Sequence, residues 1–169
     1  KVIYIIAILL IVSGVFGFHY YQKIFGKAIT KQHVLFITST DSLSDVQQRI
    51  AVFSKRPKTF LWVAAKKNFS EPKAGRYVLK EGMSNNDLIN MLRVGRQTPF
   101  KLTFNNQDTL EKFAGRIAAQ IATDSTSLIA AFKDINFLAK NNLTKKSVLQ
   151  IFIPNTYEFY WTVSPAKFR

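Results

Sequence analysis

The chain has 169 residues, of which 24 are Lys or Arg and 10 are Asp or Glu, so its formal net charge is +14. It contains no cysteine, which excludes disulfide scaffolds, Cys-ligated zinc, iron–sulfur centres and thiol catalysis. Apolar residues make up 47% of the sequence, which is enough for a packed core, so a fully disordered chain is not expected.

The first predicted element is a membrane-spanning helix. Residues 2–18 carry no charge, and Ser13 is the one polar side chain among them. A bilayer core about 30 Å thick requires roughly 20 apolar helical residues. The run reaches this length if His19, Tyr20 and Tyr21 form an aromatic belt at the interface. We therefore expect an uncleaved single-pass anchor over residues 1–21, followed by a linker over 22–32.

Two alternatives to the anchor are a buried soluble helix and a cleaved signal peptide. Few soluble helices are apolar on every face, and the run has no small-x-small cleavage site containing Ala. The orientation of the anchor stays open. Three lysines follow the run and only Lys1 precedes it, which by the positive-inside rule places the body in the cytoplasm. The chain begins with Lys, however, so we expect upstream residues that this comparison omits.

Three strand-then-helix segments follow. Each starts with a short apolar run and continues with a residue that can cap a helix. The strands are predicted over 33–38, 76–80 and 100–104, and the helices begin at Ser42, Ser84 and either Asp108 or Thr109. Another helix is predicted over 58–68, with Pro57 in its first turn. The order strand, helix, helix, strand, helix indicates a small α+β module over residues 33–96.

The remaining residues, 97–169, are expected to form a second, mixed part of the fold. One or two short helices are predicted over 125–142, a short apolar strand over 151–153 and a turn at Pro154 and Asn155. An aromatic strand is predicted over 157–161, and a further helix begins at Ser164 and Pro165. Because the sequence stops within that helix, we expect the chain to be truncated.

Among the ten carboxylates, Glu158 stands apart because aromatic residues surround it in the segment 151–161 (IFIPNTYEFYW). A carboxyl group enclosed by an apolar wall is suited to act as a general acid near neutral pH. The aromatic faces could also stack on sugar rings. The alternative is an edge-strand Glu that points to water, and the sequence leaves both interpretations open.

The basic residues are scattered along the chain and are not arranged as a nucleic-acid-binding motif, so we expect no nucleic-acid partner. Such a charge suits other anionic partners, among them lipid head groups and acidic glycans. The alternative is a well-solvated basic surface with no specific partner.

Four segments carry a family resemblance. They are residues 73–77 (KAGRY), 81–84 (EGMS) leading into 87–92 (DLINML), 108–117 (DTLEKFAGRI) and 154–159 (PNTYEF). In this order and spacing they resemble the YceG-like family of endolytic murein transglycosylases. The resemblance implies a transmembrane helix, a LysM-like module over 33–96 and, over 97–169, the incomplete N-terminal part of a mixed α/β catalytic domain.

The resemblance also implies a function. Members of this family cleave peptidoglycan glycan strands between MurNAc and GlcNAc and leave 1,6-anhydro ends, during the termination and remodelling of cell-wall synthesis. It implies no metal and no cofactor, a place in the cytoplasmic membrane with the bulk of the chain on the extracytoplasmic side, and cell-wall synthesis proteins as partners besides glycan and membrane lipid. A non-catalytic, membrane-anchored glycan-binding or scaffold protein is the alternative.

One position departs from the family pattern. The resemblance places a catalytic Glu five residues before the signature proline, where this chain has Leu149. Glu158 is the carboxylate nearest to that proline, so it becomes the candidate acid. Asn155, Thr156 and Tyr157 become candidates for substrate contact.

Overall fold

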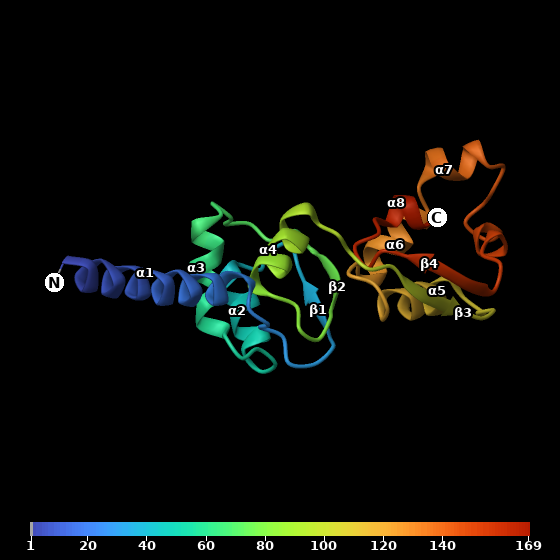
Figure 1. Ribbon diagram of the computed structural model, residues 1–169. Helices are drawn as coiled ribbons and strands as arrows, with labels where there is room; N and C mark the ends of the chain where they lie inside the picture. Colours follow the sequence, from blue (N-terminus) through green and yellow to red (C-terminus); the bar gives the residue numbers. More distant parts are fainter. Residues whose placement is uncertain (1) are drawn as a thin grey trace. The chain divides into compact units, whose positions relative to one another are not determined.

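The computed structural model describes residues 2–169, which form two compact units that divide between Gln97 and Thr98 (Figure 1). Lys1, part of the predicted span 1–21, lies outside the described residues. Both units mix helices with a two-stranded sheet, so the α+β class predicted from the sequence is observed.

Helix α1, Val2–Phe25, is apolar on all sides as far as Phe18, and none of its residues is buried. It is long and apolar enough to cross a membrane, judged by length and composition. The helix continues four residues beyond the predicted end of the span at residue 21. At about 1.5 Å per residue, its 24 residues extend roughly 36 Å.

The segment 22–32, expected to be a linker, is built into the first unit. Residues 22–25 are helical, and Ile24 packs against the core. Ala28 and Ile29 are buried, and their backbone N–H groups both donate to the carbonyl oxygen of Met83 at 3.0 Å. The segment that links the apolar helix to the first strand thus contributes two buried apolar side chains to the first unit.

The first unit has the predicted order of elements. Its strands are β1 (His33–Ile37) and β2 (Gly75–Leu79), which pair antiparallel with His33 opposite Leu79. Its helices are α2 (Leu43–Ala51), α3 (Pro57–Lys66) and α4 (Asn85–Val94). The predicted caps are confirmed, since Ser42 and Ser84 each form a capping box with the Asp three residues later. The helices bury their apolar faces against this sheet.

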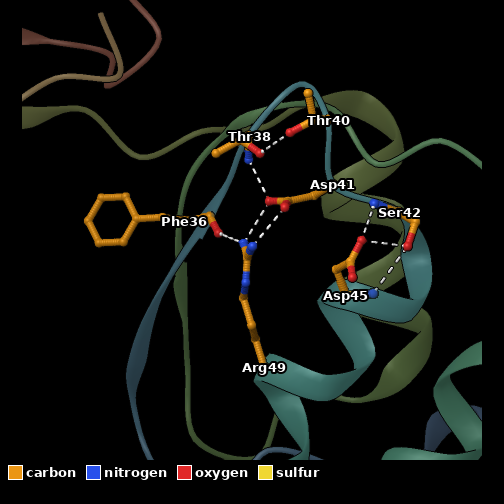
Figure 2. A network of polar contacts seen from close by, with 7 residues as sticks. All are labelled: Phe36, Thr38, Thr40, Asp41, Ser42, Asp45 and Arg49. Atoms are coloured by element: carbon orange, nitrogen blue, oxygen red, sulfur yellow. Dashed lines mark hydrogen bonds and ion pairs between the residues drawn. The ribbon is translucent and has the colours of Figure 1, made fainter. Parts of the chain in front are cut away.

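A polar network holds the turn between β1 and α2 (Figure 2). Arg49 of α2 forms a bidentate ion pair with Asp41, with N···O distances of 2.6 and 2.7 Å. The same guanidinium donates to the carbonyl oxygen of Phe36 at 2.6 Å, and Thr38 N–H donates to Asp41 at 2.7 Å. Strand, turn and helix are therefore tied together by one cation.

The second unit contains β3 (Phe100–Phe104) and β4 (Asn155–Phe159), paired antiparallel. Its helices are α5 (Leu110–Ala118), capped by Thr109, then α6 (Ser125–Phe132), α7 (Ile135–Lys140), the 3₁₀ turn η1 (Val148–Ile151) and α8 (Pro165–Phe168). Aromatic rings fill its core, among them Phe113, Phe132, Phe152 and Phe168.

Two predictions for the second unit are wrong in detail. Residues 151–153 are not a strand, because Ile151 ends the 3₁₀ turn η1, and Phe152 follows that turn outside any strand and packs on the core. Asn155 is the first residue of β4 and not part of a turn, since it pairs with Phe104. The third strand-and-helix segment also joins a sheet separate from that of the other two.

Candidate functional site

The four residues predicted for the site all lie on β4, but they divide between its two faces. Side chains alternate along a strand, so Thr156 and Glu158 share one face and Asn155 and Tyr157 the other. The structure therefore does not gather the four side chains into one cluster.

Glu158 lies on the solvent-facing side of the sheet. It is exposed and stands opposite Lys101 of β3 in the register. On the same face, the hydroxyls of Thr103 and Thr156 are 2.9 Å apart. Of the two interpretations that the sequence leaves open, the structure has the Glu that points to water, because the neighbouring Tyr157 and Phe159 point to the opposite face, where they pack against the core of the unit.

Tyr157 belongs to that inner face. Its ring stacks on Phe104 with centroids 5.5 Å apart and planes 12° apart, and its hydroxyl donates to the carbonyl oxygen of Ile153 at 2.9 Å. Asn155 is exposed at the start of the strand, where its side-chain oxygen accepts a hydrogen bond from Thr156 N–H at 2.7 Å. This geometry supports a role for Asn155 in shaping the start of β4.

An apolar hollow of about 160 Å³ lies against the inner face of β4. Aromatic and aliphatic side chains line it, with one cation at its edge: Phe104, Ile151, Phe152, Ile153, Tyr157, Phe159, Phe168 and Arg169. Ring faces of this kind can stack on the C–H face of a sugar, but the hollow is smaller than the roughly 300 Å³ typical of ligand pockets. It is suited to hold part of a ligand.

A second hollow, of about 320 Å³, has a polar rim. The side chains around it are those of Asn105, Asn106, Gln107, Lys146 and Gln150, over a floor formed by Phe113, Leu149 and Phe152. Amide groups donate and accept hydrogen bonds, which matches the hydroxyl and acetamido groups of amino sugars. Leu149, at the position where the resemblance expects an acid, is part of the floor.

The sequence did not single out residues 105–107 as part of a site. The available signal was three consecutive amide side chains directly after a strand, a pattern that also fits an ordinary polar turn. None of the side chains lining these two hollows is a carboxylate. Within residues 2–169, no group of three or more His, Cys, Asp or Glu side chains could hold a metal ion.

One solved structure with detectable similarity is a yceG-like protein from Listeria monocytogenes. The identity is 22% and the TM-score is 0.49, over 81% of this chain and 51% of that protein. The chain thus spans about half the length of that protein. No curated protein matches the chain. The model of the YceG-like family matches residues 35–169, which is most of the sequence, and the chain therefore belongs to the YceG-like family.

Proposed function

We propose that this protein is a membrane-anchored endolytic transglycosylase. It cleaves peptidoglycan glycan strands between MurNAc and GlcNAc, leaves 1,6-anhydro ends and thereby terminates and remodels strands during cell-wall synthesis. The observation that carries the proposal is the family match over residues 35–169. The aromatic and amide-lined hollows of the second unit support it, because both surfaces suit a polymer of amino sugars.

Each part of the chain has its own role in this function. Helix α1 anchors the protein in the cytoplasmic membrane, and the two units lie on the extracytoplasmic side, where peptidoglycan is found. The first unit is a LysM-like module that binds glycan, and the second is part of the catalytic domain. Cell-wall synthesis proteins are the expected protein partners.

The reaction needs one carboxyl group. As an acid it donates its proton to the glycosidic oxygen as the bond to the anomeric carbon breaks. As a carboxylate it then accepts the proton of the same sugar's 6-hydroxyl, whose oxygen closes on the anomeric carbon. The substrate supplies the nucleophile, so a second protein carboxylate is not required, in contrast to ordinary glycosidases.

Glu158 is the acid that we propose to test first. If it acts, the glycan lies over the solvent-facing side of β4, where Lys101, Thr103 and Thr156 surround the carboxylate. Tyr157, on the inner face, then contributes to substrate binding through the apolar hollow and not at the cleaved bond.

The test is a turnover assay of the natural full-length protein on purified murein, with 1,6-anhydro ends measured by mass spectrometry. Glu158→Gln should lower the rate about 10²–10⁴-fold, the usual contribution of acid–base catalysis. Glu111→Gln is the matched control, since Glu111 is an exposed glutamate of the same unit and should retain the wild-type rate. Full activity of Glu158→Gln would reject this residue as the acid.

The second candidate is a glycan-binding protein without catalysis. It is favoured by Leu149 at the expected acid position and by the lack of a carboxylate around both hollows. If the full-length protein sediments with murein but releases no 1,6-anhydro ends, the second candidate replaces the first.

A further inference from the structure

Helix α3 lies against the C-terminal end of α1 in the first unit (Figure 1). The ring of Trp62 packs edge-to-face on Tyr20, with centroids 5.0 Å apart and planes at 79°. At the start of α3, Arg56 donates to the backbone carbonyl of Gln22. These contacts place α3 directly at the C-terminal end of the apolar helix α1.

Helix α3 runs across α1, as Figure 1 shows. Its two contacts with α1 agree with this arrangement. Trp62, near the middle of α3, reaches Tyr20, and Arg56, the residue before α3 begins, reaches Gln22 only two residues further along α1. If α1 crosses a bilayer, α3 therefore runs along the membrane surface.

The depth of α3 follows from its partner. The uncharged apolar run of α1 ends at Phe18, and Tyr20, Tyr21 and Lys23 follow it, so the apolar span ends near the two tyrosines. Tyrosine and tryptophan prefer this interface. Trp62 contacts Tyr20 and thus lies at the same depth, among the lipid head groups.

The outward face of α3 is basic. Lys58, Trp62 and Lys66 follow one another at a spacing of four residues, which places them on one side of the helix. Both lysines are exposed, whereas Phe60 and Val63 on the other side are buried. This is the pattern of a helix that lies in the membrane interface.

Two further cations, Lys23 and Arg56, complete this surface. The ammonium of Lys23 is 5.7 Å from the Trp62 ring centroid, and that of Lys66 is 6.0 Å from it. A hollow of about 530 Å³ lies beside them, lined by Phe18, His19, Gln22, Lys23, Arg56 and Thr59. Arg56 directs two donors to Gln22 and has five in total, so donors remain for an anion.

We propose that this surface, formed by Lys23, Arg56, Lys58, Trp62 and Lys66, binds the head groups of anionic phospholipids and seats the first unit on the membrane. The inference rests on the proposed anchoring by α1. Charge complementarity selects anionic lipid as the occupant: the surface carries four cations and no carboxylate, at the depth of the lipid phosphates. If these residues served only to pack α3 against α1, the charge of the surrounding lipid would have no effect on which lipid lies beside Trp62.

The test uses Trp62 as a depth probe in the full chain, reconstituted into vesicles. Trp161→Phe makes Trp62 the sole tryptophan, since the chain has two. Fluorescence quenching is compared between vesicles of phosphatidylcholine and phosphatidylglycerol in which either the neutral or the anionic lipid carries bromine. We expect at least two-fold stronger quenching by brominated phosphatidylglycerol.

The preference should disappear in Lys23→Gln/Lys58→Gln/Lys66→Gln, because each lysine near an anionic surface changes association by about five-fold. The control Lys101→Gln/Lys140→Gln/Lys145→Gln removes the same charge from exposed positions of the second unit and should keep the preference. Absent quenching, equal quenching by both lipids, or an equal effect of the two triple variants would overturn the inference. Alkaline extraction from the vesicles separately reports a failure of α1 to insert.

Discussion

At the scale of single residues, Asp41 and Arg49 form a contact whose strength depends on pH. The side chain of Asp41 is 10% exposed and that of Arg49 is 42% exposed. The hydrogen bonds from Arg49 hold the pKa of Asp41 below its usual value of 3.8. A lowered pKa means that the stabilisation is present above the unfolded-state value and is lost as the pH falls through the folded-state value.

Asp41→Asn should therefore lower the free energy of unfolding by about 1–2 kcal/mol at pH 7, at the low end because water screens the exposed guanidinium. The difference from wild type should shrink as the pH falls below 4. Urea unfolding of wild type and of Asp41→Asn, at pH 7 and below pH 4, measures this difference in the free energy of unfolding. Asp108→Asn, which breaks the exposed pair with Lys112, is the control and should change stability by less than about 0.5 kcal/mol. A pH-independent difference would contradict this account.

Tyr77 gives a second prediction at the same scale. Its ring is buried in the first unit, its hydroxyl donates to the carbonyl oxygen of Lys73 at 2.7 Å, and burial raises its pKa to about 12. At neutral pH, Tyr77→Phe should lower the free energy of unfolding by about 1 kcal/mol, because the hydrogen bond to Lys73 is lost. Between pH 10 and 12 the unfolded tyrosine ionises before the folded one, so wild type should lose stability relative to the variant. Guanidinium unfolding at pH 7 and pH 11 compares them.

At the scale of elements, the ends and faces of helices depend on local chemistry. Gly95 ends α4 in the left-handed conformation, with φ 73°, which glycine adopts without strain. Gly115 lies within α5, is exposed, and has no atom within 4 Å of an added Cβ. The same substitution should therefore have opposite effects in the two helices.

Gly95→Ala should destabilise the first unit by about 1 kcal/mol, because alanine is strained at positive φ. Gly115→Ala should stabilise the second by about 0.5–1 kcal/mol, because alanine has the higher helix propensity. Thermal unfolding of the two single variants measures both signs. Destabilisation by Gly115→Ala would show that the helix propensity is not what limits α5.

At the scale of the whole molecule, each unit has its own apolar core and contains one tryptophan, Trp62 in the first and Trp161 in the second. Units with separate cores are expected to unfold as separate cooperative blocks. The two tryptophans can therefore report on the two blocks independently.

Leu88→Ala should lower the free energy of unfolding reported by Trp62 by about 2–4 kcal/mol, because Leu88 is fully buried in the first core. The unfolding transition reported by Trp161 should not change. Ile117→Ala should do the reverse in the second unit. Denaturation of each variant, followed by fluorescence in both the Trp161→Phe and the Trp62→Phe background, reports the two transitions separately. Movement of both transitions in either variant would mean that the blocks are coupled.

The sequence by itself determined the local features of this protein: the apolar helix, the caps at Ser42 and Ser84, and the order of elements from 33 to 93. These depend on groups within a few residues of one another, so short patterns are sufficient to predict them.

Only the tertiary structure decided which side of β4 faces water and how segment 22–32 packs. Side chains alternate along a strand, so Tyr157 and Glu158 lie on opposite faces of β4, but burial of the Tyr157 face depends on pairing with β3. The hydroxyls of Thr103 and Thr156, in contact across that pairing, are 53 residues apart in sequence. In the sequence, Ala28 and Ile29 are only a short apolar stretch. In the structure, they bond to the backbone of Met83 and lie against the core of the first unit. Contacts between distant segments, which no local pattern encodes, made both decisions.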